Sequence, residues 1–201
     1  FAQFLGLLTS ACPACKYGWL YTKKLERAKY LALSISDDNY ESEMEISDHL
    51  SSDLNWWIGN IDTTCNDIRL NKFEIEIFTD SSLTGWGAFS NGEKIMGWWS
   101  NIEKSKHINY LELKAIFLGL QYFAKNLKSC TVLIRTDNTT ALSYINRMGS
   151  VQHPELNSLA RETWKWCELR NLWLFASYVR SEDNTEADQA SRSLPTETEW
   201  P

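Results

Sequence analysis

The sequence lacks several features that would place it in a membrane or secreted class. Its 201 residues include no apolar run long enough to span a bilayer and no N-terminal stretch with signal-peptide character. The cysteines number five, which is odd, and their spacing gives no disulfide framework. We therefore expect an intracellular protein with reduced thiols, in the cytoplasm or the nucleus, and no membrane partner.

Basic charge is also scarce. The formal net charge is -6, whereas nucleic-acid-binding domains are more often basic. This balance argues weakly against a nucleic-acid partner, but it does not exclude an enzyme whose carboxylates meet phosphates through metal ions. No Gly-rich phosphate loop follows a strand, and no Ser or Cys lies in a nucleophile elbow. A small-molecule α/β enzyme is therefore disfavoured.

One pair of cysteines is close in sequence. Cys12 and Cys15 form the segment CPAC, which is typical of half a zinc site or of a redox pair. A closed zinc site needs four ligands, and no second pair lies at a matching spacing. We interpret the two thiols as part of a turn around Pro13.

Residues 1–70 are predicted to be helical. Apolar residues recur at helical spacing in three runs, 1–11, 20–33 and 46–61, and an acidic, Ser-rich connector lies between the second and third. The chain opens on Phe1 with the character of a helix interior. We therefore expect it to be part of a longer polyprotein.

From residue 71 onward the pattern changes to alternating strands and helices. Asn91-Gly92 predicts a tight hairpin between two of the strands. The expected strands are 73–79, 85–90, 93–100, 131–136 and 172–179, and the expected helices are 109–127, 138–148, 154–170 and 184–192. This order predicts an α/β fold with a mixed five-stranded sheet, in which three antiparallel strands are followed by parallel ones, and with helices on both faces.

Four acidic residues lie at informative places in these elements. Asp80 and Asp137 each follow a predicted strand, Glu112 lies one turn into the long helix, and Asp188 lies in the last helix. Carboxyl ends of parallel strands share one edge of a sheet, where ligands bind. Singly, each acid is better explained as a cap, a turn former or a surface residue, and Asp188 could pair with Arg192.

Considered together, the four acids predict a metal centre. Carboxylates that converge repel one another and are pushed toward protonation unless cations lie between them. Oxygen ligands without nearby His or Cys suit Mg²⁺ or Mn²⁺. Such a cluster can hold two ions and clamp a phosphodiester between them.

Four motifs then occur in a recognisable order: TDSSLTGWGA, HINYLELKA, IRTDNTTA and DNTEADQASR. Together they resemble the ribonuclease H domain of retroelement reverse transcriptases, most closely that of DIRS-like (tyrosine-recombinase) retrotransposons. Residues 1–70 are similar to the connection or thumb-end segment that precedes this domain. The resemblance implies a ribonuclease H-like fold over residues 71–196, and a polymerase domain in the same polyprotein as a partner.

The resemblance also implies an activity, namely two-metal-ion hydrolysis of the RNA strand of RNA–DNA hybrids during reverse transcription, with 3′-hydroxyl and 5′-phosphate products. Asp80 would bridge two Mg²⁺ or Mn²⁺ ions, Glu112 and Asp137 would hold one ion, and Asp188 would complete the other. Polar residues near these acids are candidates for substrate binding, although capping or turn roles explain them about equally well: Ser81, Ser82, Asn109, Asn138 and Asn184.

The sequence departs from the family pattern in two ways. Many ribonucleases H carry a His in the loop before the last acid, for product release, and the segment YVRSEDNTEAD has none. The helical insertion, rich in Lys, Arg and Trp, with which some cellular enzymes grip the hybrid is also missing. We expect the run 154–170 to be a packing helix with a solvated face.

Two alternatives stay open within the same fold. One is a catalytically inactive ribonuclease H-like module that serves as a structural or interaction domain of a retroelement-derived protein. The other is an integrase, a transposase or a 3′–5′ exonuclease. Exonuclease-like members place Glu two residues after the first Asp, and here that residue is Ser82.

Overall fold

The computed structural model describes residues 1–68 and 72–192. Within them, the chain forms two compact units: residues 1–68 with Arg147–Trp164, and residues 72–146 with 165–192. The division falls within helix α6 (Pro154–Glu168). The predicted domain boundary between residues 70 and 71, and the predicted domain end at residue 196, lie outside the described residues.

The first unit is helical, as the sequence predicts. It contains α1 (Ala2–Ala11), α2 (Lys23–Ile35) and α3 (Ser51–Asn60), with short 3₁₀ turns η1 (Gly18–Tyr21) and η2 (Asp48–Leu50). Helix α3 begins later than the predicted start at residue 46. Ile46, which the helical spacing places on the apolar face, is 56% exposed, whereas Leu50 and Trp57 of the same run are buried.

The first part of α6 groups with these N-terminal helices, although the sequence places it in the C-terminal domain. A buried ion pair explains the grouping, because Arg161 donates to both carboxylate oxygens of the fully buried Asp53. The Arg161 guanidinium also lies 5.2 Å from the centroid of the Tyr21 ring. Separating a buried pair would leave an uncompensated charge, which is strongly destabilising. The division into residues 1–70 and 71–196 stays a prediction.

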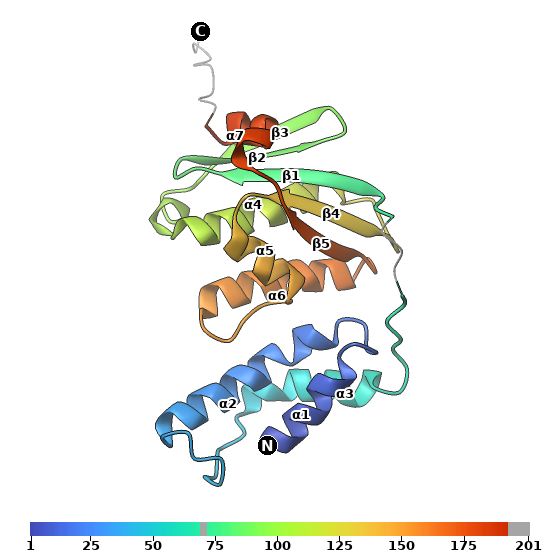
Figure 1. Cartoon of the computed structure of the whole chain (residues 1–201), viewed down its shortest axis with the longest axis vertical. Coiled ribbons are helices and arrows are strands. Elements are labelled where there is room, and N and C mark those ends of the chain that lie inside the picture. Colours follow the sequence, from blue (N-terminus) through green and yellow to red (C-terminus); the bar gives the residue numbers. More distant parts are fainter. Residues whose placement is uncertain (69–71, 193–201) are drawn as a thin grey trace. The chain divides into compact units, whose positions relative to one another are not determined.

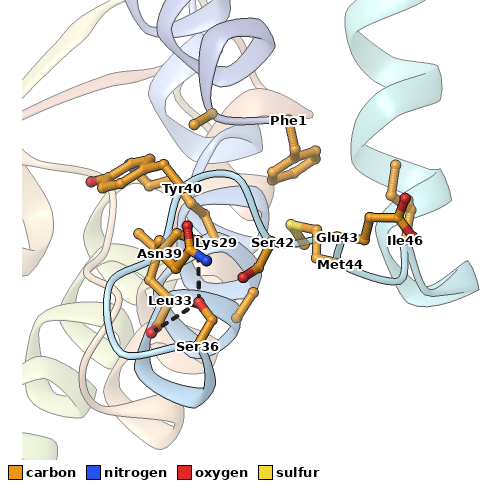
Figure 2. A pocket seen from close by; sticks show the side chains of 12 residues that line it. Phe1, Lys29, Leu33, Ser36, Asn39, Tyr40, Ser42, Glu43, Met44 and Ile46 are labelled. Carbon is orange, nitrogen blue, oxygen red and sulfur yellow. Dashed lines mark hydrogen bonds between the residues drawn. The ribbon is translucent and has the colours of Figure 1, made fainter.

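The first unit also contains a cavity of about 340 Å³, lined by α1, α2 and the segment after α2 (Figure 2). The Ser36 hydroxyl lies within hydrogen-bonding distance of the carbonyl oxygens of Leu33, at 3.4 Å, and Asn39, at 3.3 Å, and these contacts hold the start of this segment against α2. None of the predicted site residues lines the cavity. The chemistry that the sequence predicts therefore lies elsewhere.

The second unit is built on one five-stranded sheet with the order β3-β2-β1-β4-β5 (Figure 1). Strands β1, β2 and β3 pair antiparallel, while β4 pairs parallel with both β1 and β5. The strands are β1 (Ile75–Ser81), β2 (Gly85–Ser90), β3 (Glu93–Trp98), β4 (Thr131–Thr136) and β5 (Trp173–Tyr178). The predicted fold class is confirmed: the unit has a ribonuclease H-like fold.

The turn between β2 and β3 is the one that the sequence predicts. Asn91 and Gly92 both have positive φ, 49° and 83°, and Ser90 pairs with Glu93 across the turn. Two central residues with positive φ match the twist of the flanking strands. This hairpin fixes the antiparallel half of the sheet.

Helices cover both faces of the sheet (Figure 1). On one face α7 (Thr185–Arg192) packs against β1, β2 and β3. On the other, α4 (Ile108–Phe123) packs against β1 and β2, and α5 (Thr139–Asn146) packs against β5. Gly119 lets α4 approach closely, since a Cβ there would lie 3.2 Å from Ala88. Two buried layers of side chains hold the strands rigidly in place.

All five cysteines are free thiols. Helix α1 ends at Ala11, ahead of Pro13, and the buried Cys12 thiol donates to the Leu8 carbonyl oxygen at 3.3 Å. The thiol thus behaves as a packed side chain at a helix end. Among residues 1–68 and 72–192, no helix has both the length and the apolar character that crossing a bilayer requires.

Candidate metal centre

Three of the four predicted acids meet at one edge of the sheet. Asp80 lies near the end of β1, and Asp137 follows β4, its parallel neighbour. Glu112 reaches the same edge from α4. Each of these residues offers one carboxylate oxygen, and the three oxygens lie within 4.8 Å of one another. The pairing of β1 with β4 therefore brings together acids that are 57 positions apart in sequence, as the carboxyl-edge rule predicts.

Glu112 is the most buried of the three. It is 4% exposed, and its Oε2 atom is buried without a hydrogen-bond partner among residues 1–68 and 72–192. Burial, with the negative charges of Asp80 and Asp137, raises the pKa of Glu112 to about 9, against a hydrogen bond from the Ser81 backbone N–H. In the absence of a cation, this carboxyl group holds its proton at neutral pH. A buried, unpaired oxygen in an acidic cluster offers a ligand to a cation.

Asp80 is buried beside helix α7, where the Ser191 hydroxyl donates to its Oδ2 atom at 2.5 Å. Burial raises the pKa of Asp80, which the Ser191 hydrogen bond opposes, and the charges of Asp137 and Asp188 raise it further. Asp188 therefore lies close enough to act on Asp80 electrostatically.

Asp188 itself stays outside the group of three. Its Oδ1 atom lies 2.6 Å from Nη2 of Arg192, one turn further along α7, and its side chain is 33% exposed. This is the ion pair that sequence spacing offers as the ordinary explanation of Asp188. Its role as a ligand of a second ion stays a prediction.

Two serines contact the acids and are not among the predicted site residues. Ser191 donates to Asp80, and Ser181 donates to Oδ2 of Asp137 at 2.5 Å. Ser191 belongs to the QASR ending of the last motif, so a sequence signal for it exists. Ser181 comes from the turn η4 (Ser181–Asp183), and no local pattern marks it.

Asn109 and Asn138, both predicted to bind substrate, lie side by side. The Asn138 Nδ2 atom donates to Asn109 Oδ1 at 3.0 Å. Asn138 Oδ1 accepts from the Ala141 backbone N–H at 2.9 Å, so it also caps α5, which is the alternative role the sequence allows. Contact of either amide with a substrate stays a prediction.

The remaining three candidates already have partners within the protein. The Ser81 N–H donates to Glu112, and the Ser82 N–H donates to the Gly85 carbonyl oxygen at 2.9 Å, so neither group is left to bind a phosphate. Asn184 is 1% exposed, and its Nδ2 atom donates to the Thr79 carbonyl oxygen at 3.0 Å. That bond ties the start of α7 to β1. Contact of any of the three with a substrate stays a prediction.

The donor set of the cluster fits a hard divalent cation. Its ligands are carboxylate oxygens, with no His or Cys in the group. Mg²⁺ and Mn²⁺ prefer such ligands. The buried, unpartnered Glu112 Oε2 and the crowding of three acids within 4.8 Å both favour a bound cation over a structural ion pair.

The sequence profile of the family described as "Reverse transcriptase-like" matches residues 88–194 of the chain. The chain belongs to the reverse transcriptase-like family. The matched range includes Glu112, Asp137 and Asp188, and also Ser181 and Ser191. No curated protein matches the sequence.

Solved structures similar to this member of the reverse transcriptase-like family include cellular and viral proteins. Ribonuclease H1 from the archaeon Halobacterium salinarum is 15% identical over 58% of this chain and 92% of its own, with a TM-score of 0.47. LC11-RNase H1, an enzyme isolated from compost and solved with an RNA/DNA hybrid, is 18% identical over 58% and 93%, with a TM-score of 0.49. The prototype foamy virus protease-reverse transcriptase is 16% identical over 87% and 24%, with a TM-score of 0.35. The fold assignment itself rests on the order and directions of the strands.

The raised pKa of Glu112 predicts how the stability of the metal-free protein depends on pH. The unfolded chain ionises this group above a pH of about 4.5, whereas the folded protein keeps the proton up to about pH 9. The folded state binds more protons in that window, so the free energy of unfolding falls as the pH rises through it. We expect a slope of up to about 1.4 kcal/mol per pH unit from this group.

Urea unfolding in EDTA at several pH values within that window measures the slope. The Glu112→Gln variant should lose most of it, because the amide does not ionise. The Glu162→Gln variant removes an exposed carboxylate and should keep it. An unchanged slope in the Glu112→Gln variant would show that Glu112 is not the group responsible.

Proposed function

We propose that this chain is a metal-dependent endonuclease that cleaves the RNA strand of RNA–DNA hybrids. The observation that carries the proposal is the cluster of Asp80, Glu112 and Asp137, whose oxygens lie within 4.8 Å of one another, with Glu112 Oε2 buried and unpartnered. The cluster lies at the carboxyl edge of a ribonuclease H-like sheet, in a member of the reverse transcriptase-like family.

The residues divide the work by position. Asp80, on strand β1, would be the central ligand, and Glu112 and Asp137 would hold a cation together with it. Asp188 is the proposed ligand of a second ion, and Arg192 holds only one of its two carboxylate oxygens. When bound, the divalent ions stabilise developing charge on the phosphate and generate a nucleophile at neutral pH. The chain contributes ligands held by two buried layers of side chains.

Recognition of RNA is assigned to the pair of amides beside the cluster. Asn109 lies one turn before Glu112, and Asn138 directly follows Asp137. Their mutual hydrogen bond fixes both side chains next to the metal ligands. An amide offers donors and an acceptor, and the ribose 2′-hydroxyl, which also donates and accepts, is what separates RNA from DNA.

We place the activity in reverse transcription, with a polymerase domain in the same polyprotein as the partner. The support is the family match and the residue sequences of the four motifs, which resemble those of DIRS-like retrotransposons. Residues 1–70 are then the segment that connects the two activities. A polymerase-containing chain from the same source would test this proposal by its reverse transcriptase activity.

A panel of labelled substrates tests the proposed function. With Mg²⁺ or Mn²⁺, the full chain should cut the RNA strand of an RNA–DNA hybrid and leave duplex DNA, duplex RNA and single-stranded RNA intact. EDTA should abolish the cutting, because the carboxylates alone supply no nucleophile. If the hybrid stays intact with both metals, the chain is the inactive module that the sequence leaves open. Cutting of duplex DNA would instead indicate an integrase-like or exonuclease-like member of the fold.

A further inference from the structure

One short segment supplies a hydroxyl group to two of the three clustered acids. Ser181, at the start of η4, donates to Oδ2 of Asp137 at 2.5 Å. Ser191, near the end of α7, donates to Oδ2 of Asp80 at 2.5 Å. The two acids come from neighbouring parallel strands, so the segment 181–191 holds both sides of the cluster.

We propose that Ser181 and Ser191 are positioning residues, which hold the carboxylates of Asp137 and Asp80 in the orientation that binds a divalent cation. The inference rests on the proposed function for its cation, and not for cleavage of any substrate. Neither serine needs to contact the ion, the substrate or the reacting atoms.

The chemistry of a carboxylate makes this role possible. An ionised carboxylate has two oxygens and about four acceptor positions, and a hydroxyl group occupies only one of them. The remaining positions are free to bind a cation. Hydroxyl-to-carboxylate bonds of this length are charge-assisted and stronger than neutral hydrogen bonds. Since rotation about the last bond of an Asp side chain is otherwise broad, such a bond selects one orientation.

The surroundings of Ser181 argue against a purely structural role for its hydroxyl group. Ser181 is exposed, and the η4 turn is closed by backbone bonds, from Asn184 N–H to the Ser181 carbonyl oxygen and from Asp183 N–H to the Arg180 carbonyl oxygen. The turn therefore forms without the hydroxyl group. The contact with Asp137 is its one side-chain hydrogen bond among the described residues.

Ser191 differs because it is fully buried, and its hydroxyl group also lies 3.0 Å from the Asp188 carbonyl oxygen. It joins Asp80 to the helix that carries Asp188. Removing its hydroxyl group is therefore expected to cost stability as well as cation affinity. Ser90 offers a matched comparison, because it is also buried and its hydroxyl donates to the Glu76 carbonyl oxygen at 2.6 Å, within the same unit.

Calorimetric titration of the full chain with Mn²⁺, without nucleic acid, tests the inference. We expect the Ser181→Ala variant to bind Mn²⁺ about tenfold more weakly, the usual lower range for losing a group that orients a metal ligand. Ser181→Thr keeps a hydroxyl group and should restore the affinity. Ser105→Ala removes an exposed hydroxyl group that donates to the Ile102 carbonyl oxygen, and it should bind as the wild type does. Ser181→Ala should leave the unfolding temperature in EDTA unchanged.

Ser191→Ala and Ser90→Ala complete the experiment, titrated at a temperature at which circular dichroism shows both to be folded. Of these two variants, we expect Ser191→Ala to lose affinity for Mn²⁺ and Ser90→Ala to keep it. Unchanged affinity in both Ser181→Ala and Ser191→Ala would overturn the inference, as would equal losses in Ser181→Ala and Ser181→Thr. A wild type that binds Mn²⁺ but leaves the hybrid uncut would overturn the proposed cleavage, while weaker binding by Ser181→Ala would still support the positioning role.

Discussion

Replacing Asp80 by asparagine is expected to reduce cleavage of the hybrid at least about a thousandfold, without destabilising the metal-free protein. Asp80 lies in the cluster with Glu112 and Asp137, and the charges of Asp137 and Asp188 both act on it, so it is the central acid of the proposed site. An amide oxygen is neutral and a weaker ligand for a hard cation. Each 1.4 kcal/mol lost in the transition state is a factor of about ten, and cations supply several kcal/mol.

A different physical reason explains why the Asp80→Asn variant should keep its stability in the absence of metal. Asparagine matches the shape of Asp80, and its oxygen still accepts the hydrogen bond from Ser191. Burial raises the pKa of Asp80, so its ionised form is disfavoured in the metal-free fold. Removing the charge relieves that cost, so the free energy of unfolding in EDTA should stay equal or rise. Such a gain in stability on replacing a site residue is expected where a functional site destabilises the folded protein.

Single-turnover cleavage rates, with urea unfolding in EDTA and in Mg²⁺, measure both effects. The wild type should gain stability from Mg²⁺, and the Asp80→Asn variant should gain little, because a ligand stabilises only the state that binds it. Asp62→Asn, which removes an exposed carboxylate outside the cluster, should match the wild type in each measurement. Retention of cleavage within tenfold by a folded Asp80→Asn variant would contradict the assignment of Asp80 as the central ligand.

The fold could be predicted because local patterns determine most of it. Alternation in β1, the continuous apolar run of β4 and the Asn91-Gly92 turn each indicate one element, and the order of elements limits the topology to few choices. The start of α3 could not be predicted in the same way. Ile46 continues the helical spacing, but the 3₁₀ turn at 48–50 precedes the helix, and Ile46 remains exposed.

The candidate site could be predicted only in part. Asp80 and Asp137 follow from the end-of-strand rule, since β1 and β4 are parallel neighbours. Ser181 could not be predicted, because its contact with Asp137 joins residues 44 positions apart through a loop. The ion pair that Asp188 forms with Arg192 follows from their i,i+4 spacing. The same position in the last helix also suits a metal ligand, so the sequence alone does not decide between an ion pair and a ligand role for Asp188.

Substituting alanine for Gly87 is expected to destabilise the second unit by about 3 kcal/mol or more, at or above the upper range for overpacking. Gly87 lies in β2, directly opposite Asp80 in the sheet, beneath α7. A Cβ at this position would lie 2.4 Å from the Ala187 carbonyl oxygen and 2.7 Å from the Ser191 backbone nitrogen. Both are backbone atoms, so no rotamer change relieves the clash. Tight packing of β2 against α7 therefore explains the glycine at this position.

The same clash should also weaken cation binding, because α7 is the element that must move. Ser191 and Asp188 move with it, and the Ser191 hydroxyl then no longer reaches Asp80. We therefore expect Gly87→Ala to lose both stability in EDTA and Mn²⁺ affinity, whereas Asp80→Asn loses only the affinity. Gly6→Ala is the matched control. Apart from its own helix backbone and chain neighbours, no atom of the described residues lies within 4 Å of a Cβ at Gly6 in α1, so alanine there should stabilise the protein by about 0.5–1 kcal/mol through helix propensity. Wild-type Mn²⁺ affinity in a folded Gly87→Ala variant would show that the position of α7 does not control the acids of the sheet.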